Sequence, residues 1–266
     1  MNRIIAVMNQ KGGVGKTTTV VNLAACVAAQ GKRVLVVDMD PQANTTSGLG
    51  QSADVGRSMY DTLISHVPIS DILLSTPVDT LKLAPADIRL AAAEVELLSI
   101  NRRESVLKET LNAIIRPSVG TPDNPFDYVM IDCPPSLGQL TINALTAADS
   151  VLIPIQCEYY ALEGVGQLMR TIQMVKRGPN PSLDVEGVVL TMLDGRTNLG
   201  LQVVQEVKKH FKTQVYASVI PRNIRLGEAP SHGLPVHLYD PRSIGASAYQ
   251  ELAKEFIERA ERSARS

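Results

Sequence analysis

A glycine-rich loop near the start of the chain constrains its fold more than any other feature. The loop KGGVGKT at residues 11–17 follows the apolar run RIIAVMN at residues 3–9, and a helical stretch from Thr17 to about Gln30 comes after it. In this order of strand, loop and helix, successive backbone N–H groups and the helix N-terminus point at phosphate oxygens. The sequence therefore predicts a phosphate-binding P-loop inside an α/β fold.

The rest of the chain continues the alternation of strand and helix. Short apolar runs predict buried strands, and longer stretches with helical periodicity predict helices. The expected strands are residues 3–9, 33–40, 81–86, 127–132, 150–155, 184–193 and 214–220. The expected helices are residues 17–30, 87–99, 103–115, 137–146, 162–176, 201–211 and 245–262. This alternation with short turns predicts a doubly wound, mostly parallel sheet flanked by helices.

One proline-rich stretch, RPSVGTPDNPFD at residues 116–127, resembles a linker. We interpret it as a surface loop before a core strand, because no second core pattern begins there. A chain of 266 residues is long enough for one large α/β domain. We therefore expect a single P-loop domain over residues 1–266.

Composition excludes several classes of function. With 26 Lys and Arg against 27 Asp and Glu, any nucleic-acid surface must be a local patch. Cys26, Cys133 and Cys157 lie far apart, which argues against a disulfide framework or a zinc site and indicates a cytoplasmic protein. No apolar run approaches the ~18–20 residues of a membrane span, and the N-terminus has no signal-peptide pattern.

The P-loop residues each have an expected role toward a nucleotide and Mg²⁺. Glycines let the backbone approach the phosphates closely. Lys16 is expected to hold the β- and γ-phosphates, the Thr17 hydroxyl to ligate Mg²⁺, and Thr18 to help bind the α-phosphate. The loop residues expected to contact the nucleotide are Lys11, Gly12, Gly13, Val14, Gly15, Lys16, Thr17 and Thr18.

Carboxylates follow two of the expected strands. Asp38 and Asp40 come at the end of the second strand, and Pro41 makes Asp40 leave the sheet at the edge where α/β proteins bind ligands. Asp132 ends another strand, in the position that holds Mg²⁺ and its waters in P-loop enzymes. Asp38 has two interpretations, a site residue or a buried carboxylate that ties down the loop backbone.

Five motifs resemble those of the ParA/Soj family of chromosome- and plasmid-partition ATPases, within the deviant Walker-A group that also contains MinD. They are KGGVGKTT, DMDPQANTTSGLG, IDCPPSLGQLTINAL, TMLDGRTNLG and IPRNIRLGEAPSHGLPV. The resemblance covers roughly residues 3–257, and its closest likeness is to the short chromosomal Soj type.

The resemblance implies a slow, Mg²⁺-dependent ATPase that forms a face-to-face homodimer around two ATP molecules. Lys11 matches the signature lysine that reaches the partner's phosphates, acting like an arginine finger. Gly12 lies where the two chains would meet. Asp40 matches the residue that orients the attacking water, so the expected catalytic residues are Lys11, Lys16 and Asp40.

The resemblance also implies where the base and the DNA bind. Met192, Pro221 and Asn223 match the adenine contacts, although Pro221 is equally a strand terminator. Arg196 and Arg225 match arginines that bind double-stranded DNA without sequence preference. The nearby lysines at 208, 209 and 212 fit either DNA contacts or solvated charges at a helix end. A ParB-like activator and association with the nucleoid are expected.

Three alternatives share the same ATPase motifs. A MinD-like protein would gate membrane binding, but the C-terminal stretch has Tyr249, Leu252, Phe256 and Ile257 on one face and then becomes polar, so we expect a helix packed on the domain and no membrane contact. An orphan ParA-like ATPase would position another cargo. An iron–sulfur reductase of the nitrogenase iron-protein kind would need paired cysteines.

Overall fold

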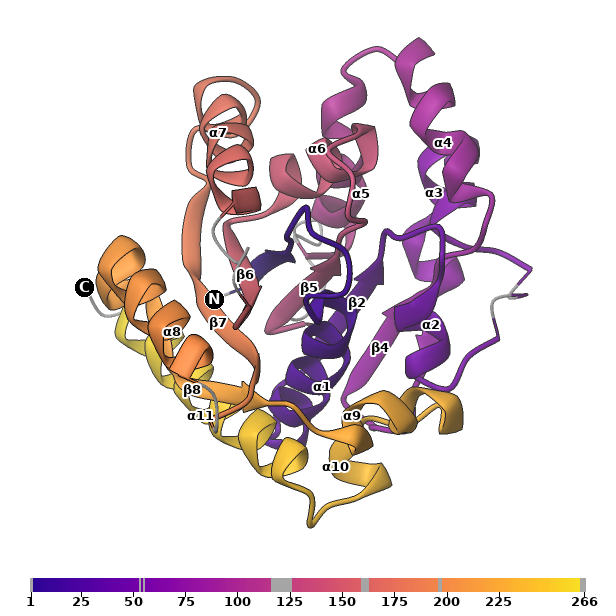
Figure 1. Cartoon of the computed structure of the whole chain (residues 1–266). Coiled ribbons are helices and arrows are strands. Elements are labelled where there is room, and N and C mark those ends of the chain that lie inside the picture. Colours follow the sequence, from indigo (N-terminus) through magenta and orange to yellow (C-terminus); the bar gives the residue numbers. More distant parts are fainter. Residues whose placement is uncertain are drawn as a thin grey trace.

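A computed structural model describes residues 2–52, 54, 56–115, 126–158, 163–195 and 198–263 (Figure 1). Within these ranges the strands are β1 (Arg3–Val7), β2 (Val34–Asp38), β3 (Leu74–Ser75), β4 (Leu81–Ala84), β5 (Tyr128–Asp132), β6 (Ser150–Gln156), β7 (Asp184–Leu193) and β8 (Val215–Pro221). The α-helices are α1 (Lys16–Ala29), α2 (Asn44–Gly48), α3 (Met59–Ser65), α4 (Leu90–Glu96), α5 (Val106–Ile115), α6 (Gln139–Ala147), α7 (Glu163–Arg177), α8 (Asn198–Phe211), α9 (Ile224–Glu228), α10 (Val236–Tyr239) and α11 (Ile244–Ser263).

The strands form one sheet in the order β3-β4-β2-β5-β1-β6-β7-β8. All neighbouring strands pair in parallel except β3 and β4, which pair antiparallel at one edge. β1 and β2 are separated by β5, so the chain crosses over the sheet between them. The expected doubly wound, mostly parallel sheet is therefore confirmed.

Both faces of the sheet are covered by helices (Figure 1). Along β1, Ile4 and Ala6 join the core under α3 to α8, whereas Ile5 and Val7 join the core under α1 and α11. Successive side chains of a strand point to opposite faces, so a strand buried on both faces must be apolar throughout. This requirement explains the unbroken apolar runs in the sequence.

Three central strands end at the same level of the sheet. Asp38 at the end of β2 lies opposite Asp132 at the end of β5, and Asp132 lies opposite Val7 at the end of β1. The P-loop leaves the sheet after β1, so parallel pairing brings the loop and both aspartates to one edge. This edge holds the site described below.

The expected elements differ from the observed ones mainly at their ends and in short segments. The expected strands 3–9 and 33–40 end at Val7 and Asp38, and the expected helix 87–99 is α4 followed by a 3₁₀ turn. The sequence pattern predicts no helix at α2, α3, α9 or α10, because each is too short for apolar residues to show a helical period. Residues 116–125 of the expected surface loop lie outside the described residues.

Helix α11 contributes strongly to the core on one face. Phe256 is fully buried, and its ring centroid lies 5.2 Å from that of Tyr128 on β5. Phe256→Ala is expected to lower the free energy of unfolding by about 3–5 kcal/mol, measured by urea denaturation. The exposed Lys254→Ala on the same helix is the control, with an expected change within about 0.5 kcal/mol. A loss below about 1 kcal/mol for Phe256→Ala would contradict this packing.

Candidate active site

The backbone conformation of the P-loop is fixed by its own glycines and by hydrogen bonds of Asn9. Gly13 and Gly15 have φ angles of 73° and 87°, in the left-handed region that favours glycine. The Asn9 side chain accepts a hydrogen bond from Lys11 N at 3.0 Å and donates to Pro154 O at 2.8 Å. These contacts place the loop between β1 and β6, with the first turn of α1 directly after it.

Lys16 is buried within this loop. Its Nζ donates to Lys11 O at 3.2 Å, so the ammonium lies on the concave side of the loop backbone. Burial lowers the pKa of Lys16, and the nearby carboxylates of Asp132 and Asp40 oppose this shift. The predicted phosphate lysine therefore lies close to both predicted site carboxylates.

Asp132 connects three elements at the end of β5. Its Oδ2 accepts hydrogen bonds from Thr17 Oγ1 at 2.8 Å and from Thr45 Oγ1 at 2.6 Å, whereas its buried Oδ1 has no partner among the described residues. Burial raises the pKa of Asp132 above its usual range, and the hydrogen bonds from the two threonine hydroxyls oppose the rise. Thr45 is a site residue that the sequence interpretation missed.

Asp38 binds the segment that carries Asp40. It accepts hydrogen bonds from Asp40 N at 3.1 Å, Thr46 N at 2.9 Å and Thr46 Oγ1 at 2.7 Å. Burial raises the pKa of Asp38 well above its usual range, and the neighbouring Asp132 carboxylate adds to the rise. Asp38 thus ties down loop backbone, as one of its two interpretations expects.

Asp40 lies just outside the sheet, at the same edge. Its Oδ1 accepts a hydrogen bond from Gln42 N at 3.0 Å, and its side chain is largely buried. The Asp40 carboxylate is close enough to Lys16 and Asp132 to affect the pKa of each. The structure therefore brings Lys16, Thr17, Asp40 and Asp132 together around the P-loop.

A cavity of about 220 Å³ adjoins the start of α1. Met192, Pro221 and Asn223, the residues matched to adenine contacts, all line it. The remaining lining residues are Gly15, Thr18, Thr191, Ile220, Arg222, Leu226, Gly227 and Tyr249. Its walls come from the ends of β7 and β8 and from α1, α9 and α11, and its mixed apolar and polar lining suits a heterocyclic base.

Lys11 and Gly12 lie on the outer side of the loop. Lys11 is partly exposed, and its Nζ lies 4.0 Å from Glu158 Oε2. A Cβ atom built on Gly12 would meet no atom within 4 Å. A side chain at Gly12 would therefore project away from the rest of the chain.

Of the two predicted DNA arginines, the structure describes Arg225, which lies on α9 and not at the P-loop. Arg225 stands in the first turn of α9, whose N-cap is Asn223: the Asn223 side chain accepts from Arg225 N at 3.0 Å. The Arg225 guanidinium forms ion pairs with Glu228 at 2.7 Å and with Asp240 at 3.1 Å. Arg196 lies outside the described residues.

The three cysteines are buried in the two cores. Burial raises the pKa of Cys26 to about 12 and that of Cys157 to about 11, and it also raises the pKa of Cys133. A buried thiol with a raised pKa is a poor nucleophile and a poor metal ligand. Cys26 thus belongs to the core that contains α1.

Helix α11 packs on the domain as expected. Tyr249, Leu252, Phe256 and Ile257 are all buried against the core that contains α1 and β8. No helix in the part of the chain that the structure describes is both long and apolar enough to cross a membrane.

Comparison with known proteins gives one family match and several similar proteins. A family model described as an AAA domain matches residues 2–185. The chain is 59% identical to the sporulation initiation inhibitor protein Soj of Bacillus subtilis, over 96% of this chain and 98% of that protein. It is 51% identical to the chromosome partitioning protein ParA of Myxococcus xanthus, over 97% and 89% of the two chains. A solved Mycobacterium smegmatis structure, described as cobyrinic acid a,c-diamide synthase with bound ADP and magnesium, matches with a TM-score of 0.84 and 40% identity, over 98% and 96% of the two chains.

Proposed function

Because this chain belongs to the ParA/Soj family of chromosome-partitioning ATPases, we propose that it is a single-domain switch that binds DNA in one nucleotide state. ATP joins two copies into a dimer that binds duplex DNA, and hydrolysis separates the copies and releases the DNA. The observation that carries this proposal is the convergence of Lys16, Thr17, Asp40 and Asp132 on one P-loop.

ATP is the substrate and Mg²⁺ is the cofactor. The donor set fits Mg²⁺, which prefers oxygen ligands. Thr17 donates its hydroxyl proton to Asp132 and keeps its oxygen lone pairs for a metal, and the buried Asp132 Oδ1 has no other partner among the described residues. When bound, the metal supplies charge stabilisation on the β- and γ-phosphates.

The chain's own residues account for the remaining requirements of hydrolysis. Backbone N–H groups of the P-loop and the Lys16 ammonium bind the phosphates. Asp40 orients the attacking water, and its fixed position matters more than its basicity, because a loose phosphoryl-transfer transition state needs little help from a base. The loop carries lysines and no arginine, so we expect slow turnover without an activator.

The outer side of the P-loop is the proposed dimer interface. Lys11 is partly exposed there, and the space beyond Gly12 is open. In a face-to-face dimer Lys11 reaches the γ-phosphate held by the partner, and ADP offers no γ-phosphate for it to reach. Because only ATP provides this γ-phosphate, we expect the dimer to form with ATP and not with ADP.

DNA binding then depends on the dimer. Arg196, outside the described residues, and Arg225 offer few phosphate contacts in one subunit, whereas two joined subunits double the number. Contacts to phosphates alone need no base-reading element, so the DNA bound is non-specific and the protein associates with the nucleoid. A ParB-like partner stimulates hydrolysis and so triggers release.

The description of the Mycobacterium smegmatis structure names a different reaction. The two partition proteins are more similar to this chain, at 59% and 51% identity against 40%. We therefore assign partitioning.

Reversal of one charge tests the DNA surface. Arg225→Glu is expected to weaken binding of a duplex by at least about tenfold in ATP. It should also flatten the dependence of log affinity on log salt by about 0.9 for each phosphate that is no longer neutralised. Fluorescence anisotropy with ATP at several salt concentrations measures both quantities, and sedimentation velocity should show an unchanged ATP dimer.

Arg262→Glu is the matched control. Arg262 also pairs with a glutamate on its own helix, Glu258 at 3.2 Å, but lies near the end of α11, away from α9. An unchanged affinity and salt slope for Arg225→Glu would remove this arginine from the DNA surface. In wild type, tight binding to anionic liposomes with ATP, and none to DNA, would replace the proposed function by membrane binding.

A further inference from the structure

Two neighbouring threonines at the start of α2 bind the two buried aspartates at the strand ends. Thr45 Oγ1 donates to Asp132 Oδ2 at 2.6 Å, and Thr46 Oγ1 donates to Asp38 Oδ2 at 2.7 Å. Both threonines are fully buried. We propose that they are positioning residues. Through them, the binding of a metal at Asp132 determines the position of the Asp40 carboxylate. This inference rests on the proposed roles of Asp40 and Mg²⁺.

One carboxylate oxygen carries the first step of this coupling. Asp132 Oδ2 accepts from both Thr17 in the first turn of α1 and Thr45 in the first turn of α2. Oδ1, which has no partner among the described residues, belongs to the same rigid, planar carboxylate. Any ligand bound at Oδ1 therefore fixes the rotation of the group and, through Oδ2, the position of the Thr45 hydroxyl.

The chain between Asp40 and Thr45 is short and tightly turned. Ala43 N donates to Asp40 O at 2.9 Å, and Ala43 itself has a φ angle of 53°, in the left-handed region. Gln42 N donates to the Asp40 side chain. A turn with these constraints has little freedom to absorb a shift, so a displacement of Thr45 reaches the Asp40 carboxylate.

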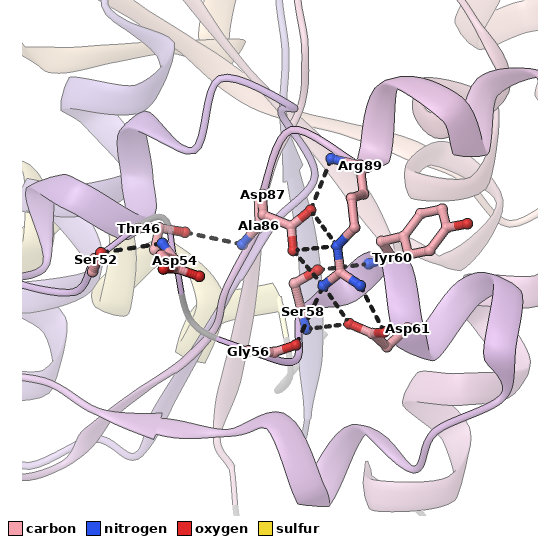
Figure 2. A network of polar contacts seen from close by, with 10 residues as sticks. All are labelled: Thr46, Ser52, Asp54, Gly56, Ser58, Tyr60, Asp61, Ala86, Asp87 and Arg89. Atoms are coloured by element: carbon pink, nitrogen blue, oxygen red, sulfur yellow. Dashed lines mark hydrogen bonds and ion pairs between the residues drawn. The ribbon is translucent and has the colours of Figure 1, made fainter.

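Thr46 attaches the other side of α2 to a fixed part of the fold. Its Oγ1 accepts from Ala86 N at 3.0 Å, just beyond the end of β4. Figure 2 shows that Ala86 adjoins a polar network in which Arg89 pairs with Asp87 at 2.6 Å and with Asp61 at 2.8 Å. Because the Thr46 side of α2 is held in place, a change at Asp132 moves the segment between Asp40 and α2 through the Thr45 hydrogen bond.

A purely structural role would be different: the threonines would only satisfy the buried carboxylates. The two roles separate in the response to Mg²⁺. If Thr45 couples the metal site to Asp40, adding Mg²⁺ to the ADP-bound protein should slow amide hydrogen exchange over residues 42–48. If Thr45 only stabilises the fold, its loss should change stability and leave this Mg²⁺ response intact.

Thr45→Val removes the hydroxyl at nearly constant volume and is the test. It is expected to lose the Mg²⁺-dependent protection of residues 42–48 and to lower kcat for ATP about tenfold, with KM for ATP changed by less than about threefold. Thr45→Ser restores the hydroxyl and should restore both. Ser47→Ala is the control on the same helix, because the Ser47 hydroxyl donates to Ala43 O, at 3.1 Å, and to neither aspartate.

Several outcomes would overturn the proposal. The proposal is wrong if the Thr45→Val protein keeps the Mg²⁺-dependent protection of residues 42–48 and a wild-type kcat. It is also wrong if the Thr45→Ser protein loses both this protection and the wild-type kcat. If Thr45→Val does not fold, the wild-type exchange experiment decides, since protection of residues 42–48 that is independent of Mg²⁺ contradicts the coupling. Failure of the proposed function gives a separate result, because wild type would then not bind DNA in ATP, and neither the exchange measurement nor kcat depends on DNA.

Discussion

Asp40→Ala is expected to bind ATP and Mg²⁺ as wild type does while its hydrolysis rate falls by about 100-fold or more. Lys16, Thr17 and Asp132 remain in place to hold the phosphates and the metal, because none of their hydrogen bonds involves the Asp40 side chain. The loss should fall on kcat alone. In the proposed cycle hydrolysis separates the two copies, so the ATP dimer should accumulate.

Phosphate release gives the rate, a fluorescent ATP analogue gives the affinity, and analytical ultracentrifugation gives the dimer fraction. Asp40→Asn is an informative companion, because an amide oxygen still accepts the hydrogen bond from Gln42 N. The exposed Asp79→Ala is the control for loss of a carboxylate. Normal turnover by Asp40→Ala would assign the positioning of water to another residue.

Gly12→Val is expected to bind ATP normally and to remain monomeric, with dimerisation weakened by at least about tenfold. The added side chain meets no atom of its own chain, and Gly12 is not among the residues with positive φ, so the loop should fold unchanged. The same side chain projects into the space that a facing copy would fill, and an overfilled interface costs about 1–3 kcal/mol or more. DNA binding should fall with the dimer.

Gly12→Ala provides a graded comparison, since its single methyl group should weaken the dimer less than valine does. Sedimentation velocity in ATP measures dimerisation, and the fluorescent analogue verifies that the nucleotide site is intact. A Gly12→Val protein that dimerises in ATP as wild type does would show that this face of the loop is not the interface.

The central fold could be predicted from the sequence because its determinants are local. Each buried strand needs an apolar run, and the P-loop needs glycines between a strand and a helix, so residues 3–30 contain all the information for β1, the loop and α1. Parallel pairing then brings the ends of β2 and β5 beside the loop. Asp40 and Asp132 could therefore be predicted at the carboxyl edge of the sheet, because each follows or ends an expected strand.

The threonine hydrogen bonds could not be predicted in this way. Thr45 and Asp132 are 87 positions apart, and the bond between them depends on how α2 packs against the sheet. A five-residue helix such as α2 shows no period, and a threonine in a polar segment has many possible roles. The sequence interpretation therefore assigned neither Thr45 nor Thr46.

The cavity beside the start of α1 presents a third situation. Its walls come from strand ends and helices far apart in the chain, so only the family resemblance indicated Met192, Pro221 and Asn223, and the structure places all three around one cavity. Tyr249 and Leu226, which also line it, carried no signal beyond being apolar core residues.

Asn223 has two structural roles, because it lines the cavity proposed to hold the base and caps the helix that carries Arg225. Any nucleotide that favours one placement of Asn223 thereby favours one placement of Arg225. Coupling between two binding sites is reciprocal, so a nucleotide that tightens DNA binding by some factor must itself be held more tightly on DNA by the same factor. Under the proposed function, DNA would therefore act as a second ligand that retains ATP, because ATP would be bound more tightly on DNA than in free solution.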